Sequence, residues 1–423
     1  MKFGFSELVL LAAIVLILFG PTVIPWVQGW LRRANQTQRQ VQQRQQQIQK
    51  QMVQEGNAIL HRFQVVTSVL LLGGAAVYLG YLMLHPAPCQ PQRYTPDPAQ
   101  MPLITAGSTQ TTVLDLAPYE DPVCVVWQDG WLYAAVNGNQ IIRVREDGTG
   151  LTPVFTSDSP IVSMAFAPDG SLYLAGTGAI YKANFDGWAV DVKPVLTQID
   201  GMPLQMPTGL AVAGDGRVFF TQYARTGAET RTESFFTELV CRGGTGTVHV
   251  FDPADGTVQQ LTGGLSGAGG LALSPDEATV YISETSARRV WAIPADARTL
   301  HIRDAGSVLL SGLNGYAAGL TRSEDGTIWT AICGEPVAWV DKMSAHPLPR
   351  QMVLNLPHLT QRWLLTPSAD SGWAFAVDAE GQLQQAVAAQ AGEMHGRITG
   401  ICETKDWLWL ANADGSQLYG IPR

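Results

Sequence analysis

Cysteine and histidine are scarce in this chain, and few of its residues are charged. The 423 residues include five Cys and seven His, and only 15% are Asp, Glu, Lys or Arg. No two cysteines have the C-x-x-C spacing, and no two histidines have the spacing of metal ligands. The sequence therefore lacks the compact motifs that predict a Cys/His zinc site or a dithiol redox centre.

Basic residues are particularly rare after residue 84. That part of the chain holds 20 Lys and Arg against 34 Asp and Glu, whereas the first 84 residues hold seven basic and two acidic residues. The phosphate backbone of a nucleic acid would be repelled by such an acidic body. We therefore expect no nucleic-acid partner.

Long uncharged runs occur twice, both before residue 85. Residues 8–19 are wholly apolar, and residues 65–84 have about the 20 residues that a helix needs to cross a bilayer. Only Lys2 precedes the first run, and no small-residue cleavage site follows it, which disfavours a cleaved signal peptide. The sequence therefore predicts two N-terminal transmembrane helices, with the lipid bilayer as a partner.

The segment between the two runs sets the expected topology. Residues 31–62 hold six Lys and Arg and one acidic residue. The positive-inside rule places such a loop in the cytoplasm. We expect a bacterial inner-membrane protein, with the N-terminus and everything after residue 84 on the periplasmic side.

The same segment is rich in Gln and predicts a helix with one narrow apolar stripe. Gaps of seven and four residues alternate along the stripe, giving an eleven-residue period on a nearly straight helix. One partner helix, from another membrane protein or from a second copy, fits such a stripe. A helix lying on the membrane surface is an equal alternative. The stripe consists of Val41, Ile48, Met52, Ile59 and Phe63.

One pattern repeats about every 40–50 residues in the rest of the chain, as in "APDGSLYLAGT" and "AGDGRVFFTQ". Each unit is an apolar strand, a turn of the Asp-Gly type, an aromatic strand and a third strand. Such units cannot bury both faces alone, and radial stacking solves this. We predict an all-β fold, a six-bladed β-propeller, with seven blades as the alternative. The sixth blade is expected from residues 372–423, and the ring is expected to close near Thr111 to Leu116.

The predicted organisation has five parts. These are a first membrane helix with an interfacial segment (1–30), a Gln-rich cytoplasmic helix (31–63), a second transmembrane helix (64–84), a Pro-rich linker (85–112) and the propeller (113–423).

The first forty residues combine Glu7, Phe19-Gly20-Pro21 and Pro25 with a short apolar helix. In these features they resemble the A-type subunit of the twin-arginine translocase. They depart from it in a Gln/Arg helix where Lys is usual, and in the second membrane run. The resemblance implies a reused membrane module and not translocation.

The repeats resemble a superfamily of six-bladed propellers over residues 113–423. The segments that carry the resemblance include "PTGLAVAGDGRVFF", "LSPDEATVYISETSARRV" and "AGLTRSEDGTIWTA". They are similar to the strictosidine-synthase-like and regucalcin/gluconolactonase proteins. Glu284 and Arg289, within the second segment, match a signature of that superfamily, and we expect a structural ion pair there and no catalysis.

The resemblance implies a divalent cation, calcium or zinc, held in the central channel by one Glu and by later Asn and Asp residues. Glu120 fills the Glu position, whereas Val162, Thr208 and Ala318 stand where Asn, Asn and Asp are implied. The position of the strictosidine-synthase acid/base glutamate is held by Thr399, which leaves that reaction without a base. We therefore expect no catalytic residue and no metal cofactor, with Ca or Zn as the alternative.

Five cysteines cannot all pair. Cys124 and Cys402 are expected on the first strands of neighbouring blades, where they could form a disulfide, and buried free thiols are the alternative. Cys89, beside the membrane run, is a candidate for acylation or an ordinary residue.

These features favour a membrane-anchored, non-catalytic propeller that acts as an accessory or scaffolding subunit of a membrane protein complex. A membrane-anchored metal-dependent hydrolase of the lactonase or arylesterase type is the first alternative. A sensor that binds a small molecule in the channel is the second.

Overall fold

The computed structural model describes residues 29, 53–85, 87, 89–98, 111–187, 189–228, 230–368, 373–388 and 396–423. The chain divides into two compact units, Met1–Pro86 and Ala87–Arg423. The predicted first membrane helix and the stripe residues Val41, Ile48 and Met52 lie outside the described residues.

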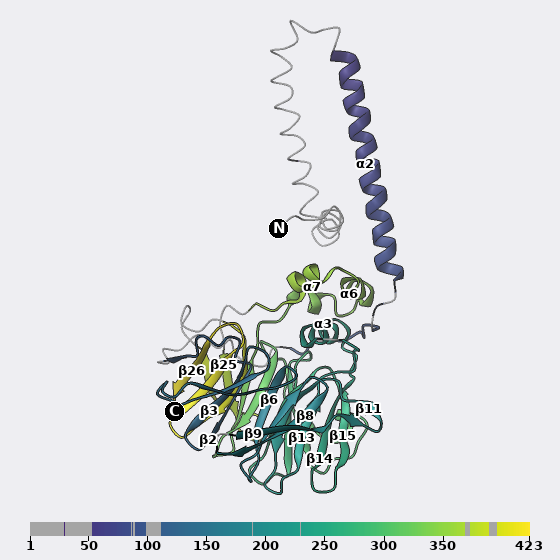
Figure 1. Ribbon diagram of the computed structural model, residues 1–423. Coiled ribbons are helices and arrows are strands. Elements are labelled where there is room, and N and C mark those ends of the chain that lie inside the picture. Colours follow the sequence, from purple (N-terminus) through teal and green to yellow (C-terminus); the bar gives the residue numbers. More distant parts are fainter. Residues whose placement is uncertain are drawn as a thin grey trace. The chain divides into compact units, whose positions relative to one another are not determined.

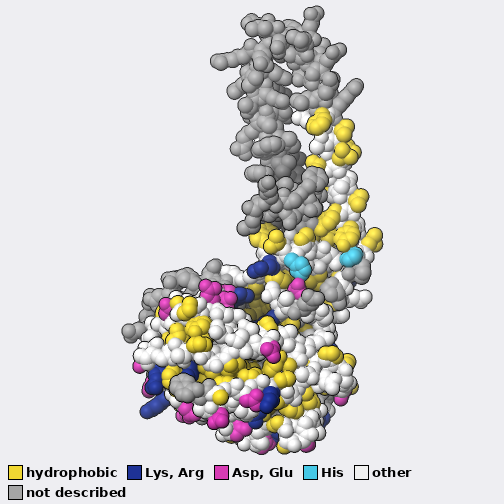
Figure 2. Space-filling model, viewed as in Figure 1, with side chains coloured by type: hydrophobic (Ala, Val, Ile, Leu, Met, Phe, Trp, Pro, Cys, Tyr) yellow, Lys and Arg dark blue, Asp and Glu magenta, His cyan; other side chains and the backbone are white. Residues whose placement is uncertain are grey.

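The first unit contains one long helix, α2 (Val53–Leu84). Its stretch Phe63–Leu84, 22 residues long, is long and apolar enough to cross a membrane. Large apolar side chains along it are exposed, for example Leu70 at 70% and Val77 at 76%. Figure 2 shows this hydrophobic surface on α2. The helix agrees with the predicted second span.

The second unit is a ring of six four-stranded antiparallel sheets, which confirms the predicted six-bladed propeller (Figure 1). The strands of blades 1 to 3 are β2 (Cys124–Gln128), β3 (Trp131–Val136), β4 (Gln140–Val144) and β5 (Thr152–Thr156); β6 (Ile161–Phe166), β7 (Leu172–Gly176), β8 (Ala179–Asp186) and β9 (Ala189–Leu196); and β12 (Pro207–Val212), β13 (Val218–Gln222), β14 (Gly246–Asp252) and β15 (Thr257–Leu265). Those of blades 4 to 6 are β16 (Ala268–Leu273), β17 (Thr279–Glu284), β18 (Arg289–Pro294) and β19 (Ser307–Leu310); β20 (Ala317–Arg322), β21 (Ile328–Ile332), β22 (Trp373–Val377) and β23 (Leu383–Ala388); and β24 (Ile398–Glu403), β25 (Trp407–Asn412), β26 (Gln417–Pro422) and β1 (Thr112–Asp115). A short ribbon, β10 (Gln198–Ile199) with β11 (Met202–Pro203), links blades 2 and 3.

The ring closes as predicted, because β1 pairs with β26 from Thr112↔Gly420 to Asp115↔Gln417. The prediction that the sixth blade comes from residues 372–423 is wrong. Residues 373–388 form β22 and β23 of blade 5, and blade 6 begins at Ile398. A helical insertion of about 40 residues separates β21 from β22, so the two halves of blade 5 do not look contiguous in the sequence.

The helices inserted into blades 3 and 5 lie on one side of the propeller and were not predicted. Blade 3 carries α3 (Arg231–Cys241) between β13 and β14. Blade 5 carries α5 (Ala338–Lys342), α6 (Pro347–Leu354) and α7 (His358–Leu365) between β21 and β22. A separate short helix, α4 (Ile302–Ala305), lies in the connection from β18 to β19, at the opposite end of its blade. Helix α3 contacts both α6 and α7, and Figure 1 shows the three together.

The turns within the blades have a local cause that the sequence pattern anticipates. In the turn after β6, the Asp169 carboxylate accepts the backbone N–H of Ser171 at 2.9 Å, and Gly170 between them has φ +80°. The same arrangement recurs at Asp325 and Thr327 in blade 5. Asp satisfies the turn backbone and Gly adopts the left-handed conformation without a Cβ penalty. In blades 1, 2, 3 and 5 an Asp-Gly turn therefore marks where the first strand ends.

Candidate functional site

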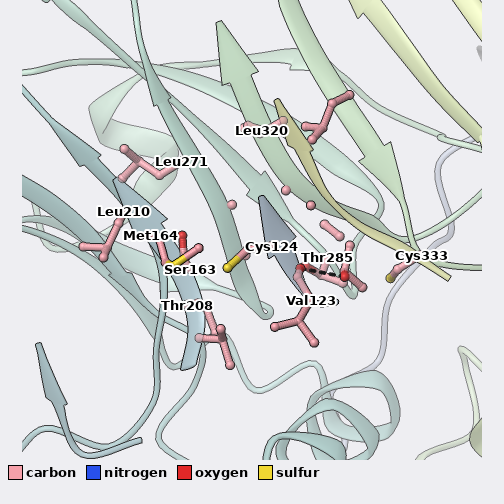
Figure 3. Close-up of a pocket in the computed structure, with 18 of the residues that line it drawn as sticks. Val123, Cys124, Ser163, Met164, Thr208, Leu210, Leu271, Thr285, Leu320 and Cys333 are labelled. Atoms are coloured by element: carbon pink, nitrogen blue, oxygen red, sulfur yellow. Dashed lines mark hydrogen bonds between the residues drawn. The ribbon is translucent and has the colours of Figure 1, made fainter. Parts of the chain in front are cut away.

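The six innermost strands surround a central cavity of about 650 Å³. These strands are β2, β6, β12, β16, β20 and β24, and each contributes lining residues. Figure 3 shows side chains from several of them converging on the cavity, including Cys124, Ser163 and Thr208. The volume is within the range of small-molecule sites in proteins.

A β-bulge stands near the start of the innermost strand in blades 2 to 6. The register shifts between Ile161 and Ser163, and the corresponding shifts in the other blades enclose Thr208, Gly269-Gly270, Ala318 and Thr399. A bulge adds one residue to one strand and redirects its side chains. The residues predicted for the channel therefore occupy equivalent bulge positions.

In blades 3 to 6 a glycine ends or follows the bulge, where the backbone of one blade meets that of the next. A Cβ on Gly209 would lie 2.6 Å from the Gly269 carbonyl oxygen, and one on Gly319 would lie 2.6 Å from the Thr399 carbonyl oxygen. Gly270 and Gly400 have equally close backbone neighbours in the following blade. These glycines allow the inner strands to close tightly around the cavity.

Hydroxyl groups from one blade satisfy the bulge carbonyls of the next. Thr208 donates to the Ala268 carbonyl at 2.6 Å, and Thr221 donates to the Gly269 carbonyl at 2.6 Å. Ser283 donates to the carbonyl of Ala318 at 2.8 Å. These bonds neutralise carbonyls that the bulges remove from the ladder. Thr208, which is 8% exposed, therefore links blades 3 and 4.

Four of the five predicted positions lie together. Val162, Thr208, Ala318 and Thr399 all line the cavity. Glu120 is the exception, because its side chain is exposed and is not among the lining residues. Its backbone N–H and C=O are both bonded to Asn137, which holds the residue in the loop before β2.

Asp121, one residue later, lines the cavity instead. It has φ +53°, a left-handed conformation that Asp tolerates better than most residues. The expected placement of Glu120 in the channel is therefore wrong by one residue. The family resemblance could not reveal this change of direction, since it depends on the local backbone.

The cavity does not fit a divalent cation. Calcium and zinc need several converging donors, and Val162 and Ala318 offer no side-chain donor. The hydroxyl protons of Thr208 and Thr399 are given to the Ala268 and Val123 carbonyls. Among the described residues, no group of three or more His, Cys, Asp or Glu side chains could hold a metal ion.

The thiols at the cavity are protonated. Burial raises the pKa of Cys333 to about 11 and that of Cys124 to about 12. A thiol is a nucleophile only as the thiolate. Neither cysteine is therefore activated for attack.

Arginine dominates the charge at one end of the cavity, which we call the helical mouth. There the inner strands begin beside α3 and α7. Arg231 of α3, Arg362 of α7 and Arg397 before β24 line this end together with Asp121. Arg397 is bonded to Asp414, and this bond raises its pKa. Desolvation by the surrounding protein lowers the pKa of Arg231, although its side chain still reaches solvent, and the charge of Arg397 acts in the same direction.

Sequence reasoning missed the three arginines because two of them lie on inserted helices. One signal was available for α3. Thr230 followed by Glu233 has the spacing of a capping box, and the Thr230 side chain accepts the Glu233 N–H at 3.2 Å.

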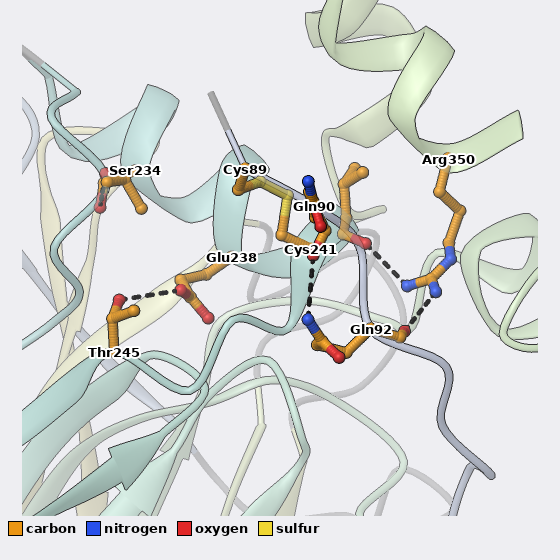
Figure 4. Close-up of a disulfide and its surroundings, with 10 residues drawn as sticks. Cys89, Gln90, Gln92, Ser234, Glu238, Cys241, Thr245 and Arg350 are labelled. Atoms are coloured by element: carbon orange, nitrogen blue, oxygen red, sulfur yellow. Dashed lines mark hydrogen bonds between the residues drawn. A yellow bond between two sulfur atoms is a disulfide. The ribbon is translucent and has the colours of Figure 1, made fainter. Parts of the chain in front are cut away.

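The disulfide joins Cys89 to Cys241 at the end of α3, with Cα atoms 6.2 Å apart (Figure 4). Cys124 and Cys402 are free and buried, so the alternative of buried thiols is confirmed and the pairing is wrong. Cys124 packs between blades 1 and 2, whereas Cys402 packs between blades 6 and 1. The two thiols therefore face opposite sides of blade 1. Acylation of Cys89 is excluded where the disulfide forms.

Residues 89–98, which we call the strap, are held against the helical insertions. Gln92 donates its backbone N–H to the Cys241 carbonyl at 2.8 Å. The Tyr94 ring lies 3.6 Å from the Arg242 guanidinium, a cation–π contact. The fully buried Arg350 donates to the carbonyl oxygens of Val240 and Gln92. The Pro-rich composition did not predict these contacts.

Asp97 of the strap pairs with Arg289 through two bonds of 2.6 and 2.9 Å. Arg289 also lies 3.8 Å from the Glu284 carboxylate, which confirms the predicted ion pair. Glu284 accepts the Ser266 N–H and the Trp291 ring N–H, each at 2.8 Å. These residues are therefore structural.

Comparisons with known proteins identify two regions. The model of the SMP-30/Gluconolactonase/LRE-like region matches residues 122–342, just over half of the chain. The model of the mttA/Hcf106 family matches residues 1–47.

Curated relatives are distant. "Protein STRICTOSIDINE SYNTHASE-LIKE 10" of Arabidopsis thaliana is 23% identical over 57% of this chain and 64% of the relative. A gluconolactonase of Zymomonas mobilis is 27% identical over 40% of this chain and 49% of the relative. The chain thus spans less than two thirds of these relatives.

Solved structures share the fold. A gluconolactonase from Xanthomonas campestris has a TM-score of 0.51 and 19% identity, covering 80% of this chain and 99% of the other. A calcium-binding regucalcin from Agrobacterium tumefaciens has a TM-score of 0.52 and 14% identity, covering 75% and 95%. At such identities the likeness concerns the fold alone.

Proposed function

The chain belongs to the SMP-30/Gluconolactonase/LRE-like family, and we propose that it is a membrane-anchored, non-catalytic member that acts as an accessory subunit of a membrane protein complex. The observation that carries this proposal is the identity of the residues that line the channel. Its bulge positions hold Val162, Thr208, Ala318 and Thr399, and the two hydroxyl groups among them bond to neighbouring blades.

Anchoring is supported by two observations. The mttA/Hcf106 model matches the N-terminal segment, and Phe63–Leu84 has the length and composition of a span. With the basic loop 31–62 in the cytoplasm, the propeller faces the periplasm of a bacterial inner membrane. The Cys89–Cys241 disulfide is consistent with such an oxidising compartment.

The partner is a membrane protein complex or a second copy of this chain. Contact runs through the transmembrane helices and the stripe of the Gln-rich helix. The acidic propeller covers the periplasmic face of the assembly and binds no nucleic acid.

Metal analysis tests the non-catalytic assignment. Purified full-length protein should hold no stoichiometric calcium or zinc, and a chelator should leave its melting temperature unchanged, since a ligand of the native state stabilises by mass action. The non-catalytic assignment would be contradicted by one tightly held cation per chain that Asp121→Asn releases and that the matched control, Glu120→Gln, retains. The hydrolase alternative would then take first place.

Native purification tests the accessory role. In mild detergent the protein should migrate with fixed membrane-protein partners or as a defined oligomer, and Ile48→Ser with Met52→Ser should disrupt that assembly. A protein that stays monomeric in the native membrane, by crosslinking, would contradict the role.

The sensor alternative has an observation in its favour. The cavity of about 650 Å³ is large enough for a small organic molecule, and hydrophobic, hydroxyl and arginine side chains line it. Ligand binding without chemistry is compatible with the accessory role.

A further inference from the structure

We propose that the helical mouth of the propeller cavity is a binding site for a small organic oxyanion, a carboxylate or phosphate on an apolar body, held by Arg231 and Arg362. This site goes beyond the accessory role and does not depend on it.

The first support is convergence. Arg231 comes from blade 3's inserted helix, Arg362 from blade 5's, and Arg397 from the chain entering blade 6, yet all three line one cavity. Arg231 is close enough to Arg397 for the charge of Arg397 to lower its pKa, and it also lies near Cys333. Cys333 directly follows β21, whose last residue pairs with Ala317, so all of them lie where the inner strands begin.

The second support is that two of the three arginines have no acidic partner within the described part of the protein. Arg397 is occupied by Asp414. In the described part of the chain, neither the Arg231 guanidinium nor the Arg362 guanidinium has a salt bridge or a hydrogen bond. Both side chains remain accessible to solvent. Asp121 is the sole acidic residue among the described residues that line this end, so the mouth is locally basic within an acidic propeller.

The third support is the chemistry of the walls. A guanidinium binds an oxyanion through parallel N–H bonds, with geometric specificity. Thr232 and Thr285 add hydroxyl groups, and Phe235 and Phe236 of α3 add an apolar wall beside Arg231. An oxyanion on an aromatic or aliphatic body satisfies both kinds of surface.

One further arginine of the same cavity can serve as the control for variants of Arg231 and Arg362. Arg322 also lines it but is the last residue of β20, four residues after Ala318. Four residues of strand span about 13 Å. Arg322 therefore marks the far end of the same cavity, and its removal should not affect a ligand at the helical mouth.

Calorimetric titration of the full-length protein in lipid nanodiscs tests the site, with benzoate and phenyl phosphate as probes and benzamide as the neutral counterpart. At least one anion should bind with a dissociation constant below about 1 mM, and more weakly as salt increases. Benzamide should bind at least tenfold more weakly. The stronger anion indicates whether the head group is a carboxylate or a phosphate.

Variants locate the site. Arg231→Gln and Arg362→Gln should each weaken binding at least tenfold, whereas Arg322→Gln should leave it unchanged. Neither mouth variant should lower the melting temperature, because no protein partner is lost. The proposal is overturned if neither anion binds, if Arg322→Gln weakens binding as strongly as Arg231→Gln, or if Arg231→Gln destabilises the fold. None of these results would affect the accessory role, which native purification tests.

Discussion

Gly270→Ala tests whether the inner strands are held at the limit of backbone approach. An added Cβ would lie 2.4 Å from the carbonyl oxygen of Ala318 and 2.6 Å from the amide nitrogen of Leu320. Ordinary contact begins near 3.4 Å. Blades 4 and 5 would thus have to separate by up to about 1 Å at this point, which also stretches the 2.8 Å bond from Ser283 to Ala318.

Overpacking a core costs about 1–3 kcal/mol, and both nearest atoms here belong to backbone that cannot rotate away. We therefore expect Gly270→Ala to cost about 3 kcal/mol. For a domain of this size that is a fall in melting temperature of about 6 °C. Thermal unfolding followed by circular dichroism, with urea unfolding as a second measure, would give both quantities.

Gly214→Ala is the matched control. The nearest atom to its added Cβ is a Glu277 carboxylate oxygen at 3.4 Å, at the end of a flexible side chain, and φ at this position is not left-handed. We expect a change within about 0.5 kcal/mol, or a small gain from a less flexible unfolded chain. The steric reasoning fails if Gly270→Ala melts within 1 °C of the parent, or if the control loses as much stability.

Three further predictions concern the propeller. Thr208→Val should cost about 1–3 kcal/mol in urea unfolding, since the buried Ala268 carbonyl loses its donor, and Thr208→Ser should restore most of it. Burial raises the pKa of Glu238 to about 7, above its unfolded value near 4.5. The free-energy cost of ionising the buried carboxyl group therefore appears as the pH rises above 4.5 and is complete above pH 7. Glu238→Gln should raise the melting temperature at pH 8 and leave it nearly unchanged at pH 4.5. Replacing Cys89 and Cys241 with Ser opens a loop of 152 residues and should lower stability by up to about 5 kcal/mol, a prediction that fails if reducing agent does not shift the parent's melting temperature.

Local patterns made the fold predictable. The Asp-Gly turns act between residues two apart, and alternating apolar strands follow from a period of two, so both are visible in a single sequence. The ring was expected to close near Thr111 to Leu116, and β1 does pair with β26, a strand far away in the sequence. The span Phe63–Leu84 needs only length and composition. The helical insertions broke the repeat and led to the wrong start for blade 6.

The site was predictable in position and not in chemistry. The family resemblance pointed to Val162, Thr208, Ala318 and Thr399, and the structure places all four at the bulges of the innermost strands. The step from Glu120 to Asp121 depends on a left-handed backbone that no sequence pattern marks. What Thr208 does was also hidden, since the carbonyl it bonds is 60 residues away.

The sequence by itself determined the repeat, the turns, the span and the acidic charge of the propeller, because these depend on the order of neighbouring residues. Only the tertiary structure decided which cysteines pair and which arginines meet. Cys89 and Cys241 are 152 residues apart, and Arg231 and Arg397 belong to different blades. Closure of the ring brings such residues together, and the packing of the inserted helices directs their side chains. Both depend on contacts between distant segments, which the order of residues along the chain does not reveal.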